Sequence, residues 1–178
     1  KIVFVPMLTI FVTGVLAFTI VGPAGSYVGG GVAAVFEAIR SVAPWAPAVI
    51  VGSLLPIMVM FGIHTSIGPL DVIQLTSVGY ANIFGPGAMV SNVATGTAAL
   101  VTSFVSKSKK DKSLATSTGI TALMGITEPA LYGVNLPKKY PLISSMIGGG
   151  IGGLYAGLSG ASRFATGSSG LPSIPLYI

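Results

Sequence analysis

The feature that most constrains how this chain can fold is an uninterrupted apolar run at residues 2–21, IVFVPMLTIFVTGVLAFTIV, whose only polar residues are threonines. A helix of about 20 apolar residues crosses the roughly 30 Å hydrocarbon core of a bilayer. Residues 46–63 and 88–105 are further apolar stretches, and 52% of the chain is hydrophobic against 7% charged. So few polar groups could not cover a soluble globule. We therefore expect an all-α, multi-pass protein of the cell membrane, with the lipid bilayer as a partner.

Glycine and proline interrupt the apolar stretches, with 25 glycines and 12 prolines in the chain. We expect the first run to end at residues 22–25, GPAG, and residues 46–63 to kink or break at Pro56. Irregular backbone at membrane depth is tolerated where it is packed in protein or lines a watery cavity, and transport proteins use such breaks. The pattern therefore favours a transporter over a bundle of plain spanning helices.

Several classes of chemistry are excluded by composition. The chain has no cysteine, which rules out disulfides, thiolate metal sites and cysteine nucleophiles. One histidine and four acidic residues leave little for a metal cage, so we expect neither a metal nor a cofactor. The nine cations are scattered or lie between apolar segments, so the net charge of +5 does not indicate nucleic acid. Because the chain starts at Lys1 without a cleavable signal, we expect a fragment of a longer protein.

Two lysine-rich segments bracket a short apolar stretch. Residues 106–113, SKSKKDKS, hold four of the nine cations and are expected to form a solvated loop, and Lys138 and Lys139 form a second cluster. The positive-inside rule places the first cluster in the cytoplasm, and the apolar run 114–126 is too short to cross. If the second cluster is also cytoplasmic, the chain between them enters and leaves on the same side. We therefore expect a re-entrant hairpin with Glu128 near its tip. The alternative is two short surface helices around an ordinary loop.

Glu128 is one of four acidic residues and directly precedes Pro129. A carboxylate in hydrocarbon costs about 3 kcal/mol or more unless it has a partner or a wet cavity. Proline removes a backbone donor and disfavours the helical conformation of the preceding residue, so nearby carbonyls need other partners. A bound sugar fits, because a carboxylate accepts two hydroxyl protons; Thr127 and Asn135 are candidates to orient Glu128 or to contact the ligand. A Glu-Pro step also begins many helices, so that interpretation stays open.

Other polar residues carry weaker signals. His64, the only histidine, ends an apolar run and precedes Thr65. Such a histidine is often a satisfied core residue, but at membrane depth its position favours a cavity-lining role. We expect Asp71 to be a cap or turn residue in a loop. Glu37 and Arg40, three residues apart, are expected to pair on one helix face, as an interface contact or an ordinary surface ion pair.

The last hydrophobic stretch, residues 141–161, carries small residues at intervals of four. Such stripes let helices approach closely in lipid, so we expect a packing feature and no chemistry. The tail after it is expected to be loop-like. The first stripe is Ser145, Gly149, Gly153 and Gly157, and the second is Ser144, Gly148, Gly152, Ala156 and Gly160.

Four stretches of the chain resemble one family of membrane proteins. The stretch GITEPALYGVNLP, residues 125–137, resembles the signature of enzyme IIC, the sugar-specific membrane component of the phosphoenolpyruvate-dependent phosphotransferase system. VGPAGSYVG (21–29), FGIHTSIGP (61–69) and IGGGIGGLYAG (147–157) are similar to stretches of the β-glucoside branch of its glucose superfamily. The resemblance implies transmembrane helices with re-entrant hairpins and an elevator-type transport domain. It also implies a permease that binds a sugar, such as a β-glucoside or related glucoside, and presents it for phosphorylation during passage.

The resemblance also implies roles for individual residues. Glu128 and His64 are expected to contact sugar hydroxyls, with Thr127, Thr65 and Asn135 as further substrate-binding candidates. Glu128 is in addition the candidate catalytic base. The family's phosphoryl donor is a cysteine on a separate IIB domain, so this cysteine-free chain is expected to act as part of a protein-phosphocysteine–sugar phosphotransferase with that domain as partner.

In domain terms, the resemblance implies that residues 1–178 are a fragment of a IIC permease domain, mostly its transport-domain half. The early helices, a last helix and the IIB and IIA domains are expected to lie outside it, and the complete protein is expected to be a homodimer. Two other functions stay open. One is an ion- or proton-coupled secondary sugar transporter that uses Glu128 without phosphorylation. The other is a structural membrane subunit that packs through its glycine stripes and binds no ligand.

Overall fold

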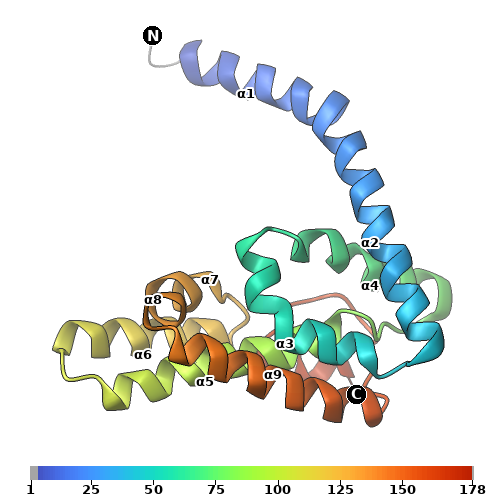
Figure 1. The fold of residues 1–178 in the computed structure, drawn as a ribbon. Coiled ribbons are helices and arrows are strands. Elements are labelled where there is room, and N and C mark those ends of the chain that lie inside the picture. The colour runs from blue at the N-terminus through green and yellow to red at the C-terminus, as the bar shows by residue number, and fades with distance from the viewer. Residues whose placement is uncertain (1–3, 178) are drawn as a thin grey trace.

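The computed structural model describes residues 4–177, and its regular elements are helices, as the sequence predicts. A long arm, α1 to α2, rises from a body formed by the other helices (Figure 1). In chain order the elements are α1 (Phe4–Leu16), the π-helical turn η1 (Ala17–Val21), α2 (Gly22–Val42), α3 (Ala46–Met60), α4 (His64–Val78), α5 (Gly85–Val105), α6 (Lys109–Leu123), α7 (Glu128–Ala130), the π-helical turn η2 (Leu131–Asn135), α8 (Leu136–Lys138), α9 (Tyr140–Leu158) and the 3-10 helix η3 (Leu171–Tyr177).

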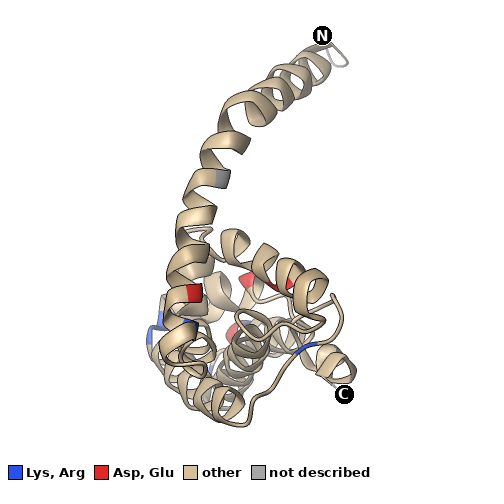
Figure 2. Ribbon diagram, turned by 90° about the vertical axis from the view of Figure 1, so that its right-hand side faces the viewer, with Lys and Arg blue, Asp and Glu red and all other residues tan. Residues whose placement is uncertain are grey.

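The arm is one continuous, bent helix, so the prediction that the first apolar run ends at residues 22–25 is wrong. The N–H of Gly22 bonds to the carbonyl of Ala17, five residues back, which makes a wider π-helical turn. A proline has no N–H and clashes with the carbonyl four residues before it, and a wider turn just ahead of Pro23 relieves that clash. Residues 4–36 of the arm carry no charged side chain (Figure 2).

Within residues 4–177, three helices are long and apolar enough to cross a membrane: Phe4–Val42, Gly85–Val105 and Tyr140–Leu158. The predicted span at residues 88–105 is therefore confirmed as the main part of α5. In contrast, α3 has 15 residues, with Pro56 inside the helix. Many large apolar side chains of the described residues are exposed, which suits a protein surrounded by lipid or by further membrane helices.

Close helix packing builds the body, in which α3, α5 and α9 contact one another and α6 lies against α5. The small-residue stripes of α9 serve this packing, as predicted. A methyl group added at Gly149, in the first stripe, would collide with the backbone carbonyl of Gly52 in α3. One added at Gly148, in the second stripe, would meet the Ala94 side chain of α5 at 3.7 Å. The first stripe therefore permits backbone contact between α9 and α3.

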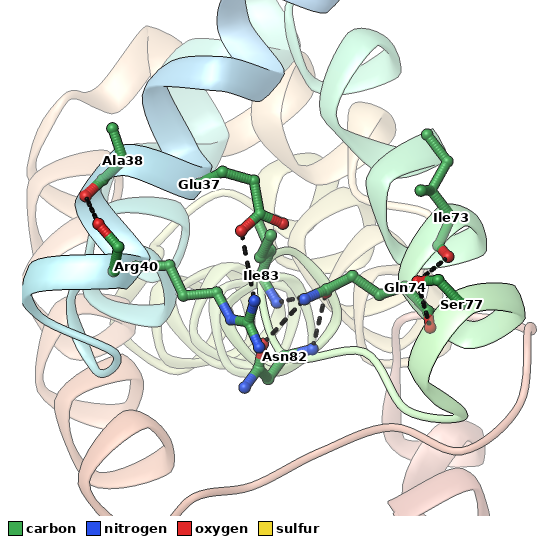
Figure 3. A network of polar contacts seen from close by, with 9 residues as sticks. Glu37, Ala38, Arg40, Ile73, Gln74, Ser77, Asn82 and Ile83 are labelled. Atoms are coloured by element: carbon green, nitrogen blue, oxygen red, sulfur yellow. Dashed lines mark hydrogen bonds and ion pairs between the residues drawn. The ribbon is translucent and has the colours of Figure 1, made fainter.

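The α4 helix was not predicted, since residues 64–87 show weak periodicity. Its buried apolar side chains include Ile67 and Leu70, and it ends at Gly79 with a left-handed φ of 84°. Buried Gln74 ties the helix to the following segment (Figure 3). Its Oε1 accepts the backbone N–H groups of Asn82 at 3.1 Å and Ile83 at 3.3 Å.

The predicted pair of Glu37 and Arg40 is present, with 3.3 Å between Oε2 and Nη1 (Figure 3). The two side chains are three residues apart on α2 and remain partly exposed. The pair therefore has the geometry of an ordinary ion pair on a helix surface.

The chain between the lysine clusters forms a helical hairpin. Of the predicted loop 106–113 only the beginning is a loop, because α6 starts at Lys109 and the Ser108 side chain accepts the N–H of Asp111 at 3.4 Å as an N-cap. The chain runs out along α6 and returns through α7, η2 and α8 (Figure 1). Lys138 Nζ is 2.9 Å from Asp111 Oδ2, so both lysine clusters lie at one end of the hairpin. Entry of this hairpin into a membrane stays a prediction.

Candidate functional site

Glu128 lies at the turn of this hairpin, where the sequence predicts a break. Gly125 has a left-handed φ of 101° and turns the chain after α6. The N–H of Leu131 bonds to the carbonyl of Thr127 at 2.8 Å, which starts the return helix at Glu128. The Glu128 side chain is exposed and has no hydrogen bond or ion pair within residues 4–177. Its carboxylate is therefore available to a ligand.

Beside Glu128, a polar face of α5 lies against the hairpin. Thr127 lines a crevice together with Ser91, Asn92 and Thr95, and the crevice is too narrow for a water molecule. Asn135 is fully buried, and its Nδ2 donates to the Thr95 carbonyl at 3.1 Å. Its Oδ1 and the Ser91 hydroxyl have no hydrogen-bond partner among residues 4–177. Buried polar atoms normally have partners, so these two atoms keep unused hydrogen-bonding capacity.

His64 and Thr65 begin α4, directly after the Gly62 turn at the end of α3. His64 is half-buried, and its Nδ1 is 3.5 Å from the Met58 carbonyl. Thr65 is exposed and donates to the carbonyl of Gly62 at 2.7 Å. The neighbouring Val59 of α3 lines the same crevice as Thr127. The structure thus brings Thr127 to the C-terminal half of α3, which leads to His64 and Thr65, whereas Asn135 lies against α5. No hydrogen bond of residues 4–177 joins His64 to Glu128.

The loop after α9 packs on the hairpin turn, a contact that the sequence did not predict. Ser168 Oγ donates to the Met124 carbonyl at 2.9 Å, and the backbone of Gly170 contacts Gly125. Asn92 Nδ2 donates to the Ser169 carbonyl at 2.9 Å. The loop therefore connects α5 to the turn that carries Glu128. The prediction that the tail after α9 is loop-like is confirmed for this loop, whereas the last part of the tail, Leu171–Tyr177, forms the 3-10 helix η3.

Arg163 anchors the start of the loop. Its backbone pairs with Ala81 through two hydrogen bonds of 2.8 Å, and the short bridge lies between distant parts of the chain. Its side chain donates from Nε to the Ala165 carbonyl at 2.7 Å and from Nη2 to the Gly167 carbonyl at 2.6 Å. Arg163 is thus almost completely buried, with its third nitrogen, Nη1, facing Asp71.

Asp71 lies inside α4, so the prediction of a cap or turn residue in a loop is wrong, although its carboxylate bonds the backbone at the start of α5. Its Oδ1 accepts the N–H of Phe84 at 3.0 Å, at the start of α5. Its Oδ2 is 3.8 Å from Arg163 Nη1 and accepts no hydrogen bond from residues 4–177. Burial raises the pKa of Asp71, although the Phe84 N–H and the Arg163 charge act in the opposite direction. The buried hydroxyl of Tyr177 lies close by, and burial likewise raises its pKa.

Sequence reasoning found the residues at the two turns and missed those that the fold brings to them. Asn92 and Arg163 carry no local motif, so nothing in their surroundings marked them. One signal was present, because Arg163 is the only charged residue after Lys139. A cation alone in an apolar tail is a candidate for pairing with a buried carboxylate.

Comparison with known proteins identifies the family. The family described as "Phosphotransferase system, EIIC" matches residues 1–149. The "PTS system sucrose-specific EIIBC component" of Pasteurella multocida is 39% identical over 177 residues, covering 96% of this chain and 36% of that protein. The "PTS system beta-glucoside-specific EIIBCA component" of Bacillus subtilis is 37% identical over 155 residues, covering 86% of this chain and 25% of that protein.

A third relative, the "PTS system trehalose-specific EIIBC component" of Escherichia coli, is 32% identical over 175 residues, covering 97% of this chain and 37% of that protein. The chain thus spans between a quarter and somewhat more than a third of the length of these relatives. No solved structure matches it. The family match covers most of the chain and agrees with the resemblance of residues 125–137. The chain therefore belongs to the EIIC family of the phosphotransferase system.

Proposed function

We propose that this chain forms the sugar-binding part of a phosphotransferase-system permease in the cell membrane. The observation that carries the proposal is the exposed, unpaired carboxylate of Glu128 at the hairpin turn, next to the hydroxyl and amide groups of α5. Relatives are named for sucrose, β-glucosides and trehalose, which are all glycosides. The proposed substrate is therefore a glycoside, translocated with concomitant phosphorylation.

In this proposal Glu128 and His64 hydrogen-bond the sugar hydroxyls, and Thr127, Thr65 and Asn135 complete the contacts. A carboxylate accepts hydroxyl protons, and an imidazole nitrogen can donate or accept according to its tautomer. The amide of Asn135 is already fixed by the Thr95 carbonyl, so its Oδ1 can accept a hydroxyl without losing an existing bond. These groups would orient the sugar.

The phosphoryl group is proposed to come from a phosphocysteine on a partner IIB domain, since this chain contains no cysteine. The sugar hydroxyl oxygen attacks phosphorus, an O–P bond forms, and the S–P bond breaks to release the thiolate. The hydroxyl proton passes to Glu128, which acts as general base. In this scheme the chain contributes the acceptor substrate and the base to a two-component transferase.

The fold fits the transport half of a larger permease domain. We propose that the α6–α8 hairpin is re-entrant, with the two lysine clusters on the cytoplasmic side, where IIB would approach. The proposed transport movement is of the elevator type, and the complete protein is proposed to be a homodimer. The arm α1–α2, which has few contacts with the body, would join this half to the preceding helices.

Glu128→Gln in the complete protein tests the function. The amide keeps the shape of the side chain but accepts protons poorly, so we expect phosphorylation to fall by a larger factor than sugar binding. Glu37→Gln, in the exposed ion pair of α2, is the matched control and should change neither. Equal loss of binding and phosphorylation would remove the role as base and leave the contact.

Vesicle uptake separates this function from the secondary-transporter alternative. Vesicles containing the complete protein, IIB and a phosphoryl donor are expected to accumulate sugar phosphate. Accumulation of free sugar, dependent on an ion or proton gradient, would contradict the phosphotransferase proposal. Absence of saturable sugar binding would favour the structural-subunit interpretation.

A further inference from the structure

A second cavity lies on the side of α5 where its N-terminus meets α4 and the loop after α9. It has a volume of about 220 Å³, whereas a water molecule occupies about 30 Å³ of liquid. The cavity is thus larger than one bound water and has the scale of a single small ring. Its walls include Gly68, Asp71, Phe84, Arg163, Thr166 and Ser169.

The charged groups of this cavity are incompletely bonded. Asp71 is 4% exposed, and its Oδ2 has no hydrogen-bond donor within residues 4–177. Arg163 Nη1, at 3.8 Å, is beyond hydrogen-bonding distance of this oxygen. A hydroxyl group between them could accept from the guanidinium and donate to the carboxylate. The Tyr177 hydroxyl lies near this pair and also has no hydrogen-bond partner among residues 4–177, so the group as a whole can bond a ligand that carries hydroxyl groups.

The remaining walls add features suited to a carbohydrate. Thr166 and Ser169 provide hydroxyls, and Phe84 provides an aromatic ring for the apolar face of a sugar. We propose that this cavity binds the second ring of a glycoside substrate, with Asp71 and Arg163 fixing its hydroxyls and Phe84 contacting the ring. This assignment rests on the proposed function, because it places the first ring at Glu128 and His64.

The position of the cavity agrees with a two-ring substrate. Gly68 and Asp71 lie four and seven residues after His64, on one face of α4. The helix rise puts Asp71 about 10 Å from His64 along the axis, a span that two linked rings can bridge. On the other side, the Ser169 carbonyl accepts from Asn92, which lines the crevice at Thr127. The cavity is thus adjacent to both parts of the candidate site.

The test compares two-ring with one-ring sugars in the purified complete protein. Sucrose and cellobiose are the two-ring probes, and methyl α-glucoside and methyl β-glucoside are the one-ring probes, with affinities measured by calorimetry. Asp71→Asn keeps a side-chain oxygen for the Phe84 N–H and removes the charge that faces Arg163. We expect the ratio of two-ring to one-ring affinity to fall about tenfold, the scale of one charged hydrogen bond.

Phe84→Leu keeps an apolar side chain at the cavity and provides a second, independent variant, for which the same ratio should fall. Glu128→Gln is expected to weaken both classes of sugar, which separates the two sites. An unchanged ratio in Asp71→Asn and Phe84→Leu would overturn the subsite and leave a water-filled structural cavity. An equal loss of both sugar classes would also overturn it, because Asp71 would then act only on the fold. If the wild-type protein binds neither class, the proposed function fails first.

Discussion

Alanine substitutions at Gly148 and Gly149, which are neighbours in α9, should affect the stability of the protein differently. Replacing glycine by alanine inside a helix gains about 1 kcal/mol of helix propensity. At Gly148 the added methyl would lie 3.7 Å from the Ala94 side chain, an ordinary contact, so the gain is retained. At Gly149 it would overlap the Gly52 carbonyl oxygen and lie 2.9 Å from the carbonyl carbon. These atoms belong to the backbone, so relief requires α3 and α9 to move apart.

Overpacking of this kind costs about 1–3 kcal/mol and more where backbone must shift. With the lost approach of α3 to α9 included, we expect Gly149→Ala to be destabilised and Gly148→Ala to be neutral or stabilised. The propensity gain is common to both variants and cancels, so the expected difference is the overpacking cost of about 1–3 kcal/mol or more. Unfolding of the purified complete protein in mixed micelles, followed by circular dichroism, measures it. Equal stabilities would show that α3 and α9 do not make backbone contact at Gly149.

Two further predictions concern the hairpin. Gly125→Ala forces a side chain into a left-handed conformation with φ of 101°, at a cost of about 1–2 kcal/mol or more, and should weaken sugar binding because this turn carries Glu128. Gly133→Ala, which has room for the methyl, should preserve binding, and equal losses would contradict the reasoning. The hydrogen bond to Asp111 raises the pKa of Lys138 in the folded protein. The charged Lys138 therefore stabilises the fold fully at pH values below the pKa that Lys138 has in the unfolded chain. This stabilisation is lost as the pH rises through the higher pKa of the folded protein. Asp111→Asn should therefore speed acylation of Lys138 at alkaline pH, measured by peptide mapping; an unchanged rate would argue against the pair.

The parts of the fold that were predicted from sequence depend on local patterns. The apolar length of residues 88–105 predicts α5, and small residues at intervals of four predict the packing stripes of α9. The Thr127-Glu128-Pro129 step marks the end of one helix and the start of another, and both lie where expected. In each case a few neighbouring residues determine the backbone, so the chain itself carries the information.

The errors arise where local signals have more than one structural solution. Pro23 predicts the end of a helix, yet a π-helical turn lets the helix continue past it. Pro69 and Gly68 obscured α4, which buried Ile67 and Leu70 stabilise through contacts elsewhere in the body. Weak periodicity does not exclude a helix when tertiary contacts decide the conformation.

The residues of the candidate site also differ in whether the local sequence predicts them. Glu128 and His64 were found because each stands in an unusual local sequence. Asp71 and Arg163 are separated by about half the chain, and their proximity depends on the bridge between Ala81 and Arg163. Such a pairing leaves no local pattern, so only the fold could reveal the second cavity.

The loop after α9 gives the proposed elevator movement a physical requirement. Arg163 connects the loop to α4 through Asp71, Asn92 connects it to α5, and Ser168 connects it to the hairpin turn. The helix that begins at His64 and the turn that carries Glu128 are therefore linked through this loop and not by a direct hydrogen bond of the described residues. A movement that carries a bound sugar must keep these two groups together, and separating them would break the connections that the loop makes. Because α6 already packs against α5, the loop is the part of the fold that would make α4 move together with α5 and the hairpin.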